Sequence, residues 1–278
     1  MIPFRSSNFR HTKDGGVILK YDEIEGMTEE IILDYDSSLL TEPHPLEYDD
    51  FLEAYLGANL DYQDIYTPNK ETVILGCTIF SEQKLEVFDR HSMKKSYIDC
   101  VPGTIVLDNA LISGNRKEQE NITGLHEGGH FWLHTDQFSE ILGQISLGSK
   151  AGKICCRKSE IDRANLQDTR SISNAEMWRE WQANVFAVTI ALPKKSLLIS
   201  VNEAFSREGI DTKQLIIDQD SGSKYLAEHV IPEYLKSIYN MSKESIRYRL
   251  QKTGFYITKK KYEEEHTNVQ MSLFDFIQ

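Results

Sequence analysis

The sequence predicts an α+β fold, in which a small sheet is followed by helices. Three segments, 72–80, 84–88 and 104–108, are rich in β-branched and aromatic residues and lie between polar or Pro-Gly breaks, which is typical of strands. Residues 115–134 and the segment from 173 to Pro193 have helical periodicity instead. With 278 residues and 40% hydrophobic content, the chain can build one large domain or two modest ones.

The helix before Pro193 has a predicted start and a predicted end. Ser173 and Glu176 have the spacing of a capping box, in which two side chains satisfy backbone N–H groups of the first turn. Pro193 cannot continue a helix and ends it. The chain beyond it is predicted to be mostly helical to about Thr253, and Gly254 stands where a helix C-terminal glycine is expected.

The chain divides into parts at changes of composition. A proline-containing connector, TEPHPLEY, marks the first boundary, and a polar stretch rich in Gly and Ser lies between the two long helices. A short amphipathic helix is expected over 49–56. The predicted parts are an N-terminal extension (1–44), a main domain (45–196) with an insertion or lid (139–172), a helical C-terminal region (197–265) and a tail (266–278).

Composition limits the classes of function. A net charge of −12 and a pI near 5.2 argue against a protein that mainly grips phosphate backbones, so nucleic acid is not expected as a partner. No apolar run has the length of a signal peptide or a membrane span, which predicts a cytoplasmic protein with no membrane contact. The four cysteines form no CxxC pair and are expected to be reduced; adjacent Cys155 and Cys156 could bind a metal, but no second thiol pair supports that.

The segment HEGGH, within the predicted helix 115–134, has the pattern of a metal site. Two histidines four residues apart on a helix project side by side, so His126 and His130 can bind one metal ion. Glu127 points to another side of the same turn, where it can act as a general base without being a ligand. Two ordinary hydrogen-bonded histidines would be the alternative interpretation.

Two further features of this helix favour a functional site. Gly128 and Gly129 together cost about 2 kcal/mol relative to alanine in a helix interior, which indicates a need for close backbone packing. His134 lies one more turn along and is expected to support the ligands and not to be a fourth one.

A third ligand is needed, because a catalytic zinc site has three protein ligands and keeps its fourth position for water. Glu176 and Glu180 lie one turn apart on the second helix, and spacing alone does not separate them. Imidazole and carboxylate ligands favour Zn²⁺ as the metal.

The two motifs GLHEGGHFWLH and EWQANVFAVTIALP together resemble the ImmA/IrrE metallopeptidase family, over roughly residues 45–255. The resemblance implies that His126, His130 and Glu180 are the zinc ligands and that Glu127 is the general base. Glu176 is then expected near the ligands, as a residue that supports them. It also implies a zincin-like fold of the gluzincin type, with a small sheet over the HExxH helix. The insertion 139–172 accounts for a wider spacing between the two motifs than is usual in the family.

The resemblance further implies a zinc-dependent metallo-endopeptidase that cleaves a helix-turn-helix repressor or another regulatory protein. The alternative is a catalytically silent zinc-fold sensor or binding module in transcriptional regulation.

Residues 226–254 have the form of two helices joined by a short turn, as in a DNA-binding helix-turn-helix. The second helix carries three basic residues, Arg247, Arg249 and Lys252. Apolar Ile246 and Leu250 and the acidic composition favour packing of these helices on the main domain over DNA contact.

The tail contains QMSLF, which resembles the short peptide by which bacterial proteins dock on the replication sliding clamp, through Gln270, Leu273 and Phe274. A terminal strand or helix docked on its own domain is an equal alternative.

Overall fold

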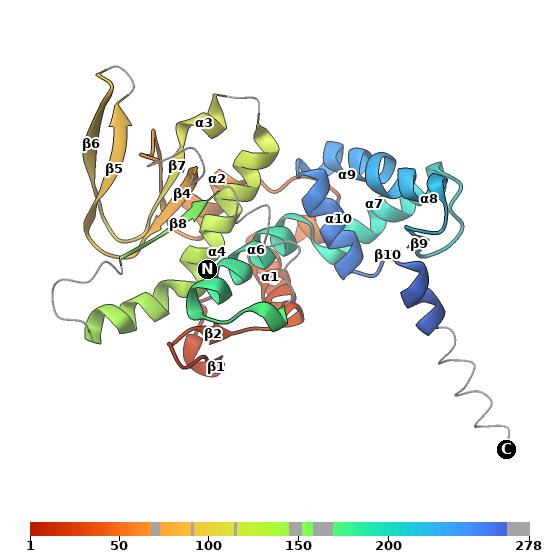
Figure 1. The fold of residues 1–278 in the computed structure, drawn as a ribbon, viewed down its shortest axis with the longest axis horizontal. Helices are drawn as coiled ribbons and strands as arrows, with labels where there is room; N and C mark the ends of the chain where they lie inside the picture. Colours follow the sequence, from red (N-terminus) through yellow and green to blue (C-terminus); the bar gives the residue numbers. More distant parts are fainter. Residues whose placement is uncertain (68–72, 90–91, 114–115, 145–151, 158–168, 266–278) are drawn as a thin grey trace.

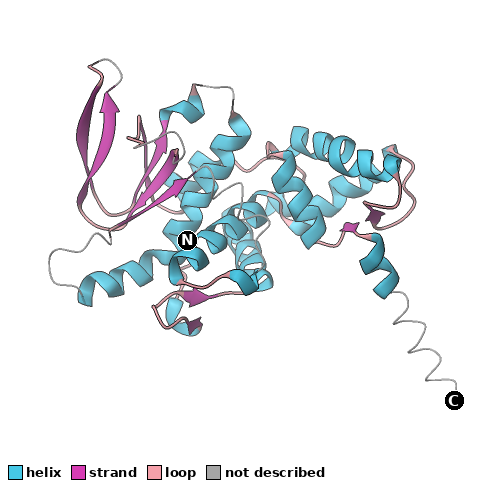
Figure 2. Ribbon diagram, in the orientation of Figure 1, coloured by secondary structure: helices cyan, strands magenta, loops and turns pink. Residues whose placement is uncertain are grey.

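The computed structural model describes residues 1–67, 73–89, 92–113, 116–144, 152–157 and 169–265 (Figure 1). Helices and several small sheets alternate along the chain, which confirms the predicted α+β class (Figure 2). The four-stranded sheet and the β5–β6 hairpin lie at one end of the molecule, two long helices cross near its middle, and the C-terminal helices with β9 and β10 form the other end. The QMSLF segment lies outside the described residues.

A four-stranded sheet has the order β3-β7-β4-β8. Its strands are β3 (Asn59–Gln63), β4 (Ile74–Ile79), β7 (Thr104–Asp108) and β8 (Lys153–Arg157). β3 runs parallel to β7, and β4 runs antiparallel to both β7 and β8. Every residue of β7 is buried, which explains its continuous apolar run, and two predicted strands, 72–80 and 104–108, form the centre of this sheet.

The third predicted strand, 84–88, belongs to a separate hairpin. β5 (Gln83–Asp89) pairs with β6 (Lys94–Cys100) and not with the four-stranded sheet. A small apolar cluster joins the hairpin to the sheet, and it consists of Ile65, Cys77, Ile79, Leu85, Val87, Cys100 and Val106. The face of β4 that bears Cys77 is therefore the face turned toward the hairpin.

Two long helices pack against each other beside the sheet. α4 (Lys117–Gln144) contains the HEGGH segment and continues ten residues past the predicted end at 134. α6 (Ala175–Ala191) ends before Pro193, as predicted. Its cap is Asn174, whose side chain accepts from the Met177 N–H at 2.8 Å, so the predicted capping box at Ser173 was wrong by one residue.

The N-terminal residues are part of the main core. α1 (Tyr21–Tyr35) packs against α6 and buries Ile24, Thr28, Ile31 and Ile32, which follow one face of the helix. The apolar residues of 1–44 share one cluster with those of α4 and α6, so the predicted boundary at 45 does not separate two cores.

The predicted insertion 139–172 also contributes to the framework. Its first residues end α4, and β8 within it is a strand of the four-stranded sheet. These two pieces therefore belong to the framework of the fold, while 145–151 and 158–168 lie outside the described residues.

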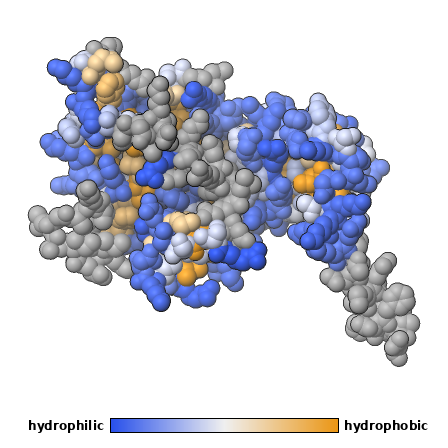
Figure 3. All heavy atoms as spheres, viewed as in Figure 1, coloured by the Kyte–Doolittle hydropathy of each residue, from blue (hydrophilic) through white to orange (hydrophobic). Residues whose placement is uncertain are grey.

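The C-terminal region is helical, as predicted. It comprises α7 (Lys194–Arg207), α8 (Ser221–Tyr225), the π-helix η5 (Leu226–Val230), α9 (Ile231–Tyr239) and α10 (Lys243–Lys252), with β9 (Leu215–Ile216) paired to β10 (Tyr256–Ile257). Gly254 follows α10 with φ +81°, the left-handed conformation expected of a C-terminal glycine. The outer face over these helices is mostly hydrophilic, with one small apolar patch (Figure 3).

The remaining short elements connect these units. They are η1 (Ser6–Asn8), β1 (Arg10–His11), β2 (Val17–Ile18), η2 (Ser37–Leu40), α2 (Tyr48–Asp50), the π-helix η3 (Phe51–Tyr55), α3 (Asn109–Ile112) and η4 (Thr169–Ser171). α2 and η3 together form the helix expected over 49–56.

In the described ranges, no single helix combines the length and the apolar composition needed to cross a membrane. α6 and α7 meet those criteria only as a pair, with a bend of 60° between them.

Arg249 ties the C-terminal helices to the rest of the protein. Its Nε donates to the Leu192 carbonyl at 2.9 Å, its Nη1 donates to the Tyr21 hydroxyl at 2.7 Å, and it forms an ion pair with Glu25. The side chain is only 1% exposed. One of the three basic residues of the helix-turn-helix-like segment therefore points inward, and Ile246 and Leu250 on the same helix are buried as well.

We predict that Arg249→Met lowers the free energy of unfolding by about 3 kcal/mol, because Glu25 and the Leu192 carbonyl lose their partner inside the protein. Arg247→Met, on the more exposed side of α10, is the matched control and changes it by less than about 1 kcal/mol. Denaturant unfolding measures both. Equal effects of the two substitutions would contradict the assigned role of Arg249.

Candidate metal centre

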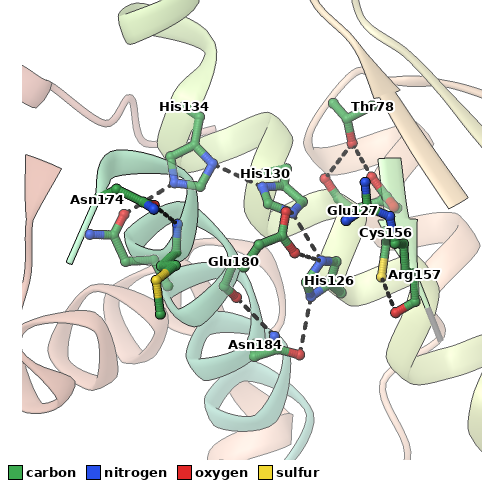
Figure 4. A network of polar contacts seen from close by, with 12 residues as sticks. Thr78, His126, Glu127, His130, His134, Cys156, Arg157, Asn174, Glu180 and Asn184 are labelled. Atoms are coloured by element: carbon green, nitrogen blue, oxygen red, sulfur yellow. Dashed lines mark hydrogen bonds and ion pairs between the residues drawn. The ribbon is translucent and has the colours of Figure 1, made fainter. Parts of the chain in front are cut away.

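The two histidines of HEGGH project from α4 toward α6. The Nε2 atoms of His126 and His130 lie 2.9 Å apart, and both side chains are fully buried. From α6, Glu180 directs its carboxylate at the same point: Oε2 lies 3.4 Å from His126 Nε2 and Oε1 lies 3.5 Å from His130 Nε2 (Figure 4). The structure thus places three potential ligands, His126, His130 and Glu180, close enough to bind one metal ion.

Glu176, the other candidate from the sequence, lies apart from this group. It is exposed in the first turn of α6, and Glu180 one turn later faces the histidines. The orientation of α6 therefore distinguishes Glu180, which faces the histidines, from Glu176, which does not.

The hydrogen bonds around His126 fix which ring nitrogen carries its proton. The Asn184 amide Nδ2 donates to the Glu180 carbonyl at 2.8 Å, so its Oδ1 is the atom that faces His126 Nδ1, at 3.2 Å. An amide oxygen only accepts, so Nδ1 of His126 carries the proton. The lone pair of His126 Nε2 then points at the shared point between the ligands.

A longer chain of hydrogen bonds determines which ring nitrogen of His130 carries the proton. The Gln182 Nε2 donates to the Val17 carbonyl at 2.6 Å, which turns its Oε1 toward His134 Nε2 at 3.1 Å. His134 Nε2 is therefore the donor, and His134 Nδ1 accepts from His130 Nδ1 at 3.1 Å. This leaves a lone pair on His130 Nε2, and His134 supports a ligand without itself joining the group.

These assignments test whether the residues fit a metal. Two nitrogen lone pairs 2.9 Å apart repel each other unless a proton on one nitrogen or a metal ion lies between them. For ligands about 2.0–2.1 Å from a tetrahedral metal, the expected spacing between donor atoms is roughly 3.4 Å. The three observed spacings of 2.9, 3.4 and 3.5 Å are close to that value, so the donor set fits a small divalent cation.

Electrostatics keep His130 and Glu180 in the forms that bind a metal. Burial alone would lower the pKa of His126, but the adjacent Glu180 and Glu127 outweigh it and raise that pKa, so a metal would displace a proton from this ring. Burial, together with the nearby His126, lowers the pKa of His130 to about 4, so the ring is neutral at physiological pH. Burial alone would raise the pKa of Glu180, but the adjacent His130 and His126 outweigh it and lower that pKa below its usual range. Glu180 is therefore a carboxylate.

Glu127 lies beside the centre and has one free oxygen. Thr78 on β4 donates to its Oε2 at 2.5 Å, whereas Oε1 is buried without a hydrogen-bond partner. Burial raises the pKa of Glu127 to about 8, and the positive charge of a metal at the centre would lower it again, toward the carboxylate form that a base needs. Gly76 makes room for this side chain, because a Cβ there would lie 2.7 Å from Glu127 Oε1.

The two glycines of HEGGH allow close packing, as their sequence cost indicated. A Cβ on Gly129 would lie 3.1 Å from the Ala183 Cα of α6, and one on Gly128 would lie 2.6 Å from the Leu52 side chain. Gly129 thus lets α4 approach α6 closely enough for Glu180 to reach the histidines, and Gly128 lets η3 pack on the other side of α4.

A cysteine that the sequence interpretation set aside also lies here. A thiol sulfur of Cys156, a ring nitrogen of His126 and a carboxylate oxygen of Glu127 all lie within 4.8 Å of one another. Cys156 is fully buried. Because β8 was not predicted, nothing in the sequence indicated that Cys156 would lie near the histidines.

Thr78, Gln182 and Asn184 are further site residues that the sequence interpretation did not assign. Asn184 lies four residues after Glu180 in the EWQAN motif, so its helical spacing was an available signal, whereas Gln182, two residues after Glu180, had none. Thr78 had no such signal, because it reaches Glu127 only through the packing of β4 on α4.

Comparison with known proteins gives no family. No family model, no curated protein and no solved structure matches the chain. The interpretation of the centre depends on its geometry and on the motifs.

We predict that Gln182→Met weakens metal binding by about 10- to 100-fold, because the His134 and His130 tautomers lose the group that selects them. Gln137→Met is the matched control, since Gln137 is a buried α4 residue whose amide donates only to the Leu133 carbonyl. Competition with a chromophoric chelator measures both affinities. If Gln182→Met bound metal as tightly as the control, the proposed hydrogen-bond chain would not select the ligand tautomers.

Proposed function

We propose that this protein is a zinc-dependent metallo-endopeptidase of the ImmA/IrrE type. The observation that carries the proposal is the convergence of two histidine lone pairs and the Glu180 carboxylate beside Glu127, whose Oε1 has no partner. A zincin-like arrangement agrees with the contacts of α4, which packs on β4, β7 and β8 as well as on α6.

The donor set favours zinc among the divalent metals. Two imidazoles and one carboxylate are a common catalytic zinc ligand set, and three protein ligands leave one coordination position open. Magnesium and calcium prefer sites made only of oxygen atoms.

In the proposed hydrolysis of a peptide bond, Glu127 transfers the proton and Thr78 positions Glu127. When bound, zinc supplies a Lewis acid that polarises the scissile carbonyl and acidifies water. Glu127 accepts the proton of the attacking water on Oε1 and returns it to the leaving amine. Thr78 holds Oε2, so that the same oxygen performs both transfers.

The substrate proposed is a helix-turn-helix repressor or another regulatory protein, and it comes from the resemblance of the two motifs. β8 offers a means of binding an extended segment of such a protein. Among the described strands, β8 is at one end of the four-stranded sheet, next to β4 and the centre. An added strand at a sheet edge binds through its backbone, which suits an endopeptidase.

The burial of the potential ligands favours a second candidate function, that of a catalytically silent zinc-fold sensor or binding module. His126, Glu127 and His130 are fully buried, and Glu180 is only 15% exposed. Structural zinc sites are closed in this way, whereas catalytic sites need access for substrate.

One pair of variants separates these functions. Glu127→Gln should retain zinc and lose hydrolysis, because an amide cannot accept the proton; His126→Ala should lose the metal, because a ligand is removed. The metal is measured by elemental analysis, and hydrolysis is read by mass spectrometry after incubation with candidate repressors from the same genome. Glu176→Gln, an exposed carboxylate on the same helix as Glu180, should change neither.

Zinc-dependent cleavage by wild type and Glu176→Gln, with none by Glu127→Gln, is the expected result. Zinc bound with no cleavage of any candidate would favour the binding module. Less than about half an equivalent of any transition metal after gentle purification would contradict both.

A further inference from the structure

We propose that Cys156 is a reserve metal ligand whose thiolate fills the fourth coordination position in a latent state of the centre. The inference rests on the proposed metal site and adds a ligand to it.

Strand register decides which of the adjacent cysteines faces the centre. In the β4–β8 pair, Cys156 stands opposite Gly76 and Cys155 stands opposite Cys77. Residues paired across two strands point to the same face of a sheet. The Gly76 face is the one that meets Glu127 of α4, since a Cβ at Gly76 would touch that carboxylate.

The other cysteines point away from the centre. Cys77 belongs to the apolar cluster between the sheet and the hairpin, and Cys155 packs against that cluster. Cys100 on β6 belongs to it as well. Of the four thiols, all unpaired in disulfides, Cys156 alone lies in a potential ligand group with a centre histidine in the described part of the chain.

Coordination requires the Cys156 thiol to move toward the histidines. With Zn–S near 2.3 Å and Zn–N near 2.0–2.1 Å, sulfur and nitrogen on one tetrahedral metal are about 3.6 Å apart. The Cys156 sulfur lies within 4.8 Å of a ring nitrogen of His126, and it does not belong to the group of His126, His130 and Glu180, so it has to move toward the point that those three residues share. The thiol now contacts the Arg157 carbonyl at 3.8 Å, a weak interaction that a metal bond would replace (Figure 4).

A second observation points to the same ligand. Glu127 Oε1 is fully buried, has no hydrogen-bond partner and belongs to the group that contains Cys156. Coordination by the thiol would break its S–H bond and pass the proton to the Glu127 carboxylate, and the thiolate would take the place of water at the metal. No oxidant or reductant is required. The latent state therefore has its open position filled and its base protonated at once.

Substitution of Co²⁺ for zinc in the full-length protein tests this directly, because a thiolate bound to cobalt gives a near-ultraviolet charge-transfer band that nitrogen and oxygen ligands do not give. We expect wild-type protein to show that band together with the visible bands of tetrahedral cobalt. Cys156→Ser should lose the charge-transfer band and keep the visible bands, which show that the protein is folded and loaded. Cys155→Ser and Cys77→Ser, the matched controls, should keep both.

The possible results are distinguishable. Visible bands without a charge-transfer band in wild type would overturn the assignment of Cys156 and leave the centre of His126, His130 and Glu180 intact. A charge-transfer band that survives Cys156→Ser and disappears in Cys155→Ser would overturn it too. Failure of wild type to bind cobalt, with zinc also absent, would overturn the metal centre and with it the proposed function.

Discussion

The contact between α4 and α6 at Gly129 is the constraint on which the centre depends. His126 and His130 belong to one helix and Glu180 to the other, so the ligands converge only if the helix axes are close. A Cβ at Gly129 would press on the Ala183 backbone, and backbone cannot turn away as a side chain can. The two glycines weaken α4 by about 2 kcal/mol in helix propensity, and the apolar contacts between the helices offset that cost.

The second requirement is that both Nε2 atoms present lone pairs. For His126, the hydrogen bond from its Nδ1 to Asn184 of α6 meets this requirement. For His130, it is met by a chain of hydrogen bonds through His134 and Gln182 that ends at the Val17 carbonyl. Val17 is in the N-terminal segment, which is held against α6 by α1 and, through Glu25, by Arg249 of the C-terminal helices. Residues distant in sequence thus determine the proton position on one ligand, which explains why the three regions share a single core.

The sequence predicted the parts of the site that lie on single helices. HEGGH and EWQAN are local patterns. Helical periodicity placed His126 and His130 on one face, whereas the choice of Glu180 over Glu176 came from the resemblance of the motifs. The sequence patterns could not predict β8, α1 or the position of Cys156 beside His126. These features depend on strand pairing and on packing between segments that are distant in the sequence. α1 has many charged residues around a narrow apolar face, and the capping box at Ser173 competed with an equally good cap at Asn174 one residue later.

The central claim is that one metal ion binds between α4 and α6. Diffraction data recorded on both sides of the zinc absorption edge, from crystals of the zinc-loaded protein, test it most directly. The account predicts a single anomalous peak about 2.0–2.2 Å from His126 Nε2, His130 Nε2 and a Glu180 oxygen. A peak at the Nδ1 atoms, or one that excludes Glu180, would contradict it.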